Sequence, residues 1–133
     1  MFKYLYTEDG HVPAHEYMPC DDFDGGPSWG LALVLSSGLL VKATGTTKPT
    51  YVSMVEEGAK VTEGALIPVI RVTPDIIFET ELSASGTSLV PGNLVTLASD
   101  GLRVTATTNS GVAEIVSLDP PQGSGDKVRV RFN

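Results

Sequence analysis

Turn-forming residues interrupt this sequence so often that long regular elements have little room to form. The chain has 14 glycines and nine prolines among its 133 residues. Proline breaks helices and is excluded from central strands, while glycine marks tight turns. No stretch shows sustained helical periodicity, and the length fits one domain with a core of its own. We therefore predict an all-β fold, a small β-barrel or β-tulip-like sandwich of short strands with an extended N-terminal arm.

Apolar and β-branched segments between these turns indicate where the strands lie. A Ser-Ser-Gly stretch at 36–38 separates the first two of them and predicts a hairpin turn. We expect strands at residues 31–35, 39–43, 50–55, 66–72, 76–82, 112–118 and 127–132.

The clearest local signal is an Asp-Gly pair at 100–101 between two alternating segments. Asp-Gly favours a two-residue type I′ hairpin turn. This register would place Leu97 opposite Val104 and Val95 opposite Ala106 on one face, with Thr96 opposite Thr105 on the other. Apolar side chains would then meet apolar ones and threonine would meet threonine, as cross-strand pairing prefers.

Residues 58–69 and 86–97 share a spacing of glycines and apolar residues without a gap. Each segment reads as a turn, an apolar residue, a glycine and then a strand. The recurrence predicts a small closed barrel or sandwich with approximate internal symmetry. The alternative is that glycine-rich β chains repeat such patterns by chance.

The charge distribution excludes several classes of partner. The formal net charge is −7, and residues 1–30 carry six acidic side chains against one lysine. Nucleic acids and anionic membrane surfaces attract clustered Lys and Arg, so we expect neither as a partner. The single cysteine, Cys20, allows no internal disulfide. The first residues lack the apolar region of a signal peptide, and we expect a soluble protein that is intracellular when made.

Residues 1–30 form the predicted arm, and residues 31–133 form the predicted β-body. The arm holds six of the nine aromatic residues and is broken by Pro and Gly. Aromatic side chains each bury a large area. The arm therefore either wraps its own domain or docks on a neighbouring protein, and the sequence leaves both arrangements open.

The arm also contains the chain's candidate reactive groups. Zinc-type ligands occur there, but their spacing matches no paired-ligand signature, and a solvated acidic loop explains them better. Cys20 with a nearby histidine could form a nucleophilic pair, although a flexible arm would hold it poorly. We predict no catalytic residue, no cofactor and no metal site. The ligand types considered are His11, His15, Cys20, Asp21, Asp22 and Asp24.

Three cations alternate with apolar residues in the last predicted strand. Lys127, Arg129 and Arg131 would share one face, and the opposite face would be apolar. Such a face is either solvated or in electrostatic contact with an acidic neighbour, for example the arm of an adjacent copy.

Four short motifs resemble those of head decoration (capsid cement) proteins of tailed bacteriophages. They are Gly-Asn-Leu-Val-Thr-Leu at 92–97, Asp-Gly-Leu-Arg-Val at 100–104, Gly-Val-Ala-Glu-Ile at 111–115 and the terminal Val-Arg-Val-Arg at 128–131. The resemblance implies a structural virion protein, not an enzyme. Such a protein binds the outer surface of the assembled capsid and stabilises contacts between major capsid protein subunits.

The resemblance also implies partners and a location. The partners would be the major capsid protein and further copies of the chain, as a trimer or alternatively a dimer. The location would be the capsid exterior, after assembly in the host cytoplasm. Other readings are a phage tail or spike module, or a small non-enzymatic ligand-binding β-barrel. The residues expected to bind partners are Tyr4, Tyr6, Tyr17, Phe23, Trp29, Lys127, Arg129 and Arg131.

Overall fold

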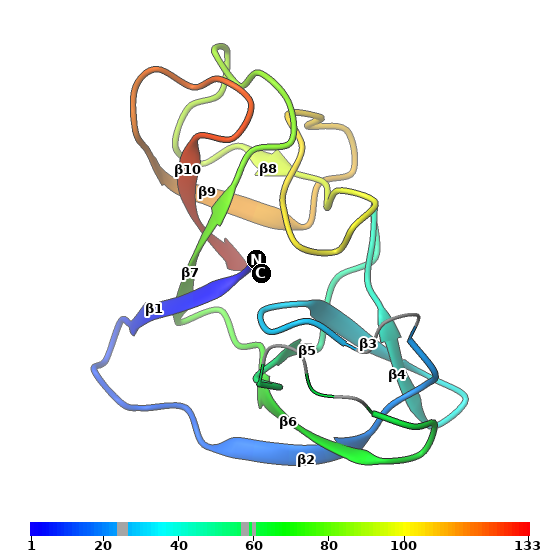
Figure 1. Ribbon diagram of the computed structural model, residues 1–133. Helices are drawn as coiled ribbons and strands as arrows, with labels where there is room; N and C mark the ends of the chain where they lie inside the picture. Colours follow the sequence, from blue (N-terminus) through cyan, green and yellow to red (C-terminus); the bar gives the residue numbers. More distant parts are fainter. Residues whose placement is uncertain (24–26, 57–58, 60) are drawn as a thin grey trace.

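The computed structural model describes residues 1–23, 27–56, 59 and 61–133 (Figure 1). These residues form ten strands and no helix, which confirms the all-β prediction. The strands are β1 (Lys3–Thr7), β2 (His15–Pro19), β3 (Ala32–Ser36), β4 (Leu39–Lys42), β5 (Tyr51–Ser53), β6 (Leu66–Arg71), β7 (Ile76–Glu81), β8 (Leu94–Val95), β9 (Ala113–Leu118) and β10 (Lys127–Phe132).

The strands form two antiparallel sheets of five strands each, arranged as a sandwich. The first sheet has the order β1-β7-β10-β9-β8, and the second has the order β2-β6-β5-β3-β4. Figure 1 shows the first sheet in the upper part of the view and the second sheet below it. No closed barrel is found among the described residues. Of the two architectures predicted, the structure therefore has the sandwich and not the barrel. All seven strands expected from the sequence are present, with bounds shifted by at most two residues.

Residues 1–30 contribute one strand to each sheet. β1 pairs with β7 in the first sheet, and β2 pairs with β6 in the second. The N-terminal segment therefore packs on its own domain, which was one of the two arrangements open from the sequence. Periodicity gives little sign of these strands, because a bulge between Tyr4 and Tyr6 shifts the register of β1 and Pro19 ends β2.

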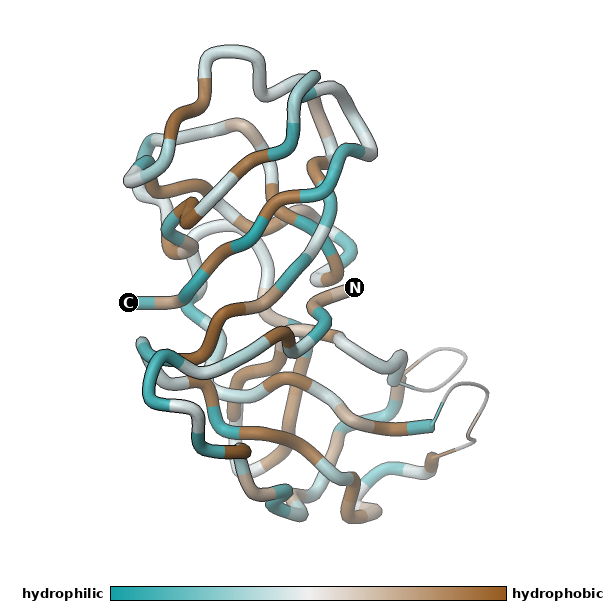
Figure 2. The backbone as a smooth tube through the Cα atoms, turned by 90° about the vertical axis from the view of Figure 1, so that its left-hand side faces the viewer, coloured by the Kyte–Doolittle hydropathy of each residue, from teal (hydrophilic) through white to brown (hydrophobic). Residues whose placement is uncertain are grey.

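The core between the two sheets forms around an aromatic cluster. Phe2, Phe78 and Phe132 are fully buried, and their ring centroids lie 5.3 to 6.4 Å apart. Side chains alternate along a strand, so Val128 and Val130 point inward with Phe132. Figure 2 shows the matching alternation of hydrophilic and hydrophobic residues along the chain.

A second core lies on the opposite face of the second sheet. Leu33, Leu40, Tyr51 and Val69 are buried there, whereas their strand neighbours contribute to the inter-sheet core. The sheet curls so that β4 approaches the end of β2, where Cys20 forms an isolated bridge with Leu40. Apolar side chains on both faces explain why these strands read as nearly continuous hydrophobic runs.

The register predicted for the Asp-Gly hairpin is correct near the turn, but the turn type is wrong. Leu97 bridges Val104, and the Oγ1 atoms of Thr96 and Thr105 lie 2.7 Å apart. The Ala98 N–H, however, donates to the Arg103 carbonyl, so residues 99–102 form a four-residue loop.

The side chain of Asp100 accounts for this longer loop. Its carboxylate accepts hydrogen bonds from the Leu102 N–H and from Arg103 Nε. Only Gly101 of the predicted turn pair has positive φ, whereas a type I′ turn needs it at both central residues. Beyond Thr96 the ladder also shifts, and Val95 pairs with Ala113 of β9 instead of Ala106.

A type I′ turn does occur at the first predicted hairpin. Ser37 and Gly38 have φ of 51° and 81°, and the flanking residues Ser36 and Leu39 are paired. Two central residues with positive φ are the requirement of this turn. The hairpin expected between the first two predicted strands is therefore confirmed.

The two similar sequence segments adopt the same turn. Gly64 and Gly92 have φ of 82° and 95°, each at the third position of a hydrogen-bonded turn that leads into β6 or β8. The Gly64 N–H donates to the Cys20 carbonyl, and the Gly92 N–H donates to the Ile115 carbonyl, both at 2.8 Å. The return bonds, from Cys20 to Ala65 and from Ile115 to Asn93, also match. The two segments therefore share their backbone conformation and hydrogen bonds at these turns. Residues 58 and 60 of the first segment lie outside the described part of the chain.

Candidate partner-binding surface

Exposed apolar side chains gather on one face of strands β2 and β6. Residues opposite each other in an antiparallel pair share a face. Tyr17 lies opposite Pro68, and Pro19 lies opposite Leu66. Tyr17 is 63% exposed and Leu66 is 64% exposed, so two large apolar side chains face solvent at neighbouring positions of this face.

The same face continues toward β1. His15 lies opposite the buried Ile70, and both line a hollow of about 80 Å³ with Tyr4, Val12, Pro13 and Met54. Val12 is 81% exposed at its rim. We call Val12, His15, Tyr17, Pro19, Leu66 and Pro68 the β2–β6 surface.

The β2–β6 surface is the outer part of the face that forms the inter-sheet core. Ile70 and Val52 belong to that core and are covered by the first sheet. Leu66 at the other end of β6 remains exposed. A group of exposed apolar side chains on one face is a candidate protein contact site.

The five aromatic residues predicted to bind partners have different surroundings. Tyr17 and Tyr6 are exposed, on β2 and β1 respectively. Tyr4 packs against the inter-sheet core, Phe23 packs against the second core, and Trp29 is half-buried. Only Tyr17 lies on the β2–β6 surface itself, and Tyr4 lines the adjoining hollow.

Sequence reasoning did not identify the other five residues of the surface as partner-binding: Val12, His15, Pro19, Leu66 and Pro68. The sequence did hold one relevant signal, because Leu66 opens an apolar run, Leu-Ile-Pro-Val-Ile, in which neither face is polar. Such a run indicates a strand that needs a covering on both sides.

The three predicted cations lie together on the outer face of the first sheet, as alternation predicted. Arg129 binds Asp119 through both terminal nitrogens, at 3.0 and 2.8 Å. Arg131 contacts Glu114 at 2.5 Å and Glu8 at 2.6 Å, and Lys127 lies 3.7 Å from Glu79. Acidic groups of the same chain, including Glu8 of the N-terminal segment, therefore neutralise this face.

These pairs change the titration of the acidic partners. The hydrogen bond from Arg131 holds the pKa of Glu114 below its ordinary value. The hydrogen bonds from Arg129 do the same to the pKa of Asp119. Both carboxylates are thus stabilised in their charged form.

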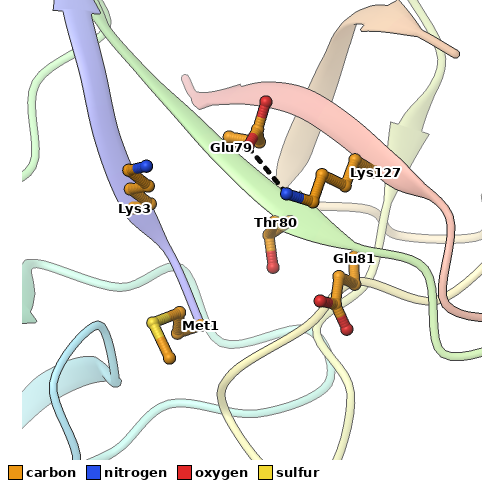
Figure 3. Close-up of a pocket in the computed structure, with 6 residues that line it drawn as sticks. All are labelled: Met1, Lys3, Glu79, Thr80, Glu81 and Lys127. Atoms are coloured by element: carbon orange, nitrogen blue, oxygen red, sulfur yellow. Dashed lines mark ion pairs between the residues drawn. The ribbon is translucent and has the colours of Figure 1, made fainter.

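A shallow cleft lies beside Lys127, over the last residues of β7 (Figure 3). Its volume is about 180 Å³, and Lys127 and Glu79 form an ion pair within it. Pockets for small molecules usually span about 300 to 1,000 Å³. The cleft is thus small for a ligand-binding site, and it is lined by Met1, Lys3, Glu79, Thr80, Glu81 and Lys127.

Among the described residues, the structure does not bring together the zinc-type ligands named above. Cys20 is buried in the second core, where burial raises the pKa of its thiol. His15 lies on the β2–β6 surface. His11 instead lies beside Asp9 and Asp75, the one group of metal-type ligands found among the described residues, and Asp24 lies outside them.

Comparisons of this chain with models of protein families, with curated proteins and with solved structures found no match. Within residues 1–23, 27–56, 59 and 61–133, no helix is long and apolar enough to cross a membrane.

Proposed function

We propose that this chain is a structural virion protein that binds the outer surface of an assembled phage capsid and stabilises contacts between major capsid protein subunits. The observation that carries the proposal is the β2–β6 surface, an exposed apolar face on a rigid β-sandwich. Exposed aromatic groups such as Tyr17 are among the residues that anchor protein interfaces, and neighbouring apolar groups help to exclude water from them.

The motifs that resemble those of decoration proteins lie in the strands and turns of the sandwich, and they support the proposal through this shared scaffold. The segment at 92–97 forms the Gly92 turn and β8, the segment at 111–115 enters β9, and 128–131 lies in β10. All belong to the first sheet, whereas the β2–β6 surface belongs to the second. The resemblance thus concerns the scaffold, and the docking face is a property of this chain's own β2 and β6.

The occupant that we propose for the β2–β6 surface is an apolar strip on the outside of the major capsid protein. The cations of β10 are already paired within the chain, so docking does not depend on them. We therefore expect binding that is only weakly sensitive to salt, because apolar contacts are not screened. Many copies on one shell multiply a modest contact through multivalency.

We also propose that copies of the chain associate with each other, as a trimer, on the capsid exterior. Light scattering of the purified chain after size exclusion measures this state. A trimeric mass supports the proposal, and a monomeric mass up to high concentration contradicts the trimer for the free protein.

The test of docking uses co-sedimentation with purified heads of the phage that encodes the chain, prepared without this protein. The variant Tyr17→Ser with Leu66→Ser removes the two largest exposed groups of the surface. We expect at least about a tenfold loss of affinity, the size typical of interface anchors. Val90→Ser is the matched control, because Val90 is an exposed apolar residue, at 55%, outside the surface.

Normal decoration by the double variant would contradict the docking face. Absence of binding by the wild-type chain would contradict the function itself. Assembly of the purified chain into tubes or fibres would instead favour a tail or spike module. Three clefts among the described residues have volumes of about 80 to 180 Å³, below the usual size of a small-molecule pocket, so they do not favour a ligand-binding barrel.

A further inference from the structure

We propose that Asp9, His11 and Asp75 form a binding site for a divalent transition-metal ion of the Zn²⁺ type. Each residue offers one ligand atom, and these atoms all lie within 4.8 Å of one another. His11 Nδ1 contacts Asp9 Oδ1 and lies 3.5 Å from Asp75 Oδ2. The His11–Asp75 separation is close to that between two ligands of a single zinc ion, whereas the His11–Asp9 contact is a hydrogen bond that would have to open for both groups to bind the ion.

Strand pairing brings the three residues together. β1 ends at Thr7, which pairs with Ile76 at the start of β7. The Glu8 N–H donates to the Asp75 carbonyl at 2.9 Å, so the chain just after β1 runs beside the chain just before β7. A turn closed by the Gly10 N–H then brings His11 back toward Asp9.

Neighbouring hydrogen bonds orient the ligands, as they do in most metal sites. Thr73 Oγ1 donates to Asp75 Oδ1 at 2.5 Å, which leaves Asp75 Oδ2 facing His11. Thr7 Oγ1 donates to the His11 carbonyl at 2.6 Å and holds the backbone of the turn. The side chains are positioned by groups that would not themselves contact the ion.

An open hollow adjoins His11, although neither Asp9 nor Asp75 lines it. A hollow of about 170 Å³ is lined by His11, Pro13, Glu16, Arg71 and Ile76, among others. The side chains of His11 and Asp9 are half-exposed or more, so an ion can enter from solvent. Arg71, the cation in the hollow, is already bound to Glu16 by two hydrogen bonds.

The ligand set favours a transition metal over calcium or magnesium. An imidazole nitrogen with carboxylate oxygens suits Zn²⁺, whereas Ca²⁺ and Mg²⁺ prefer oxygen ligands alone. Two carboxylates balance the charge of a divalent ion. The competing arrangement is the hydrogen bond between His11 and Asp9 beside Asp75, which needs no metal.

The experiment is calorimetric titration of the full chain with Zn²⁺ at pH 7.5. The variants are His11→Gln and Asp75→Asn. His15→Gln is the matched control, because it removes the other histidine and leaves the cluster intact. We expect one Zn²⁺ per chain in the wild type and the control, and at least a tenfold weaker affinity in each cluster variant.

A second measurement distinguishes a loss of Zn²⁺ binding from a loss of the folded structure. Amide NMR spectra report whether each variant keeps the wild-type fold, and Zn²⁺ should shift signals near residues 9–11 and 75 in the wild type. Folded cluster variants that bind as tightly as the wild type overturn the site. Absence of Zn²⁺ binding by the wild type, or tighter binding of Ca²⁺, also overturns it. The outcome is independent of capsid binding.

Discussion

Phe2 shows how much a single side chain near the start of the sequence contributes to this fold. Its ring packs against Phe132 and Phe78, which lie more than 70 positions away in the chain. Its N–H donates to the Gly30 carbonyl at 2.8 Å. The contacts join both ends of the sequence to the centre of the first sheet.

Replacing Phe2 with alanine should therefore destabilise the protein strongly. Removal of a buried phenylalanine typically lowers the free energy of unfolding by about 3–5 kcal/mol. Urea denaturation measures this change. Tyr17→Ala, at an exposed position, should change it by about 0.5 kcal/mol or less. Equal effects of the two variants would refute the assigned core.

Acid should weaken the fold through Glu114 and Asp119. Each carboxyl has a folded-state pKa below its ordinary value because an arginine donates hydrogen bonds to it. A lowered pKa stabilises the fold above the ordinary carboxyl pKa of about 4, and this contribution is lost as the pH falls through the folded value. We expect denaturation midpoints to be constant near neutral pH and to fall below about pH 4.

Carboxyl-carbon NMR titration tests the cause of this acid sensitivity. Arg131→Gln should raise the pKa of Glu114 toward its ordinary value, since it removes the donor. Arg71→Gln, which removes a pair on the other sheet, should leave Glu114 unchanged. An ordinary pKa for Glu114 in the wild type would contradict the assigned pair.

At the scale of strands and turns, the sequence predicts those elements whose signals are local. The alternation of charged and apolar residues predicted β10 with its observed bounds. The turn at Ser37 and Gly38 was predicted because these residue types are common at turns, and both residues have positive φ. β1 and β2 were missed because their residues become strands through pairing with β7 and β6, far along the chain. The loop at Asp100 was predicted wrongly because a two-residue turn and a four-residue loop are compatible with the same register. The side-chain hydrogen bonds of Asp100 stabilise the four-residue loop.

Gly111 is required by the approach of β8 to β9. A Cβ atom at this position would overlap the backbone carbonyl of Leu94. We expect Gly111→Ala to lower the free energy of unfolding by about 2–3 kcal/mol, the upper range for single substitutions. Gly123→Ala is the control, because its Cβ would lie 3.6 Å from the nearest atom, an ordinary contact. Equal denaturation midpoints for the two variants would contradict this role.

At the scale of the whole molecule, the sequence indicated part of the candidate surface. Tyr17 was identified from its residue type, but Leu66 joins it only through the β2–β6 register. The contact between His11 and Asp75 could not be predicted from the sequence for the same reason. Asp75 approaches His11 only when β1 pairs with β7. Contacts between distant segments depend on topology, which local patterns do not encode.

The domain should not fold without its first residues. Deleting residues 1–24 removes β1, β2 and Phe2, and so exposes edges and apolar faces of both sheets. We expect the shortened chain to show no cooperative thermal transition by circular dichroism. The full chain is the control, and a cooperative transition of the shortened chain near the same temperature would show that residues 25–133 suffice.

The order of the first sheet has a consequence for synthesis on the ribosome. β10 lies between β7 and β9, yet its residues are translated after those of both neighbours. Until they emerge, the nascent chain exposes the inner faces of β7 and β9 and the ring of Phe2. Such gaps in a sheet invite pairing with other chains. A chaperone bound to the nascent chain during this interval would therefore reduce such pairing, whereas a pause in translation before β10 would prolong the exposure.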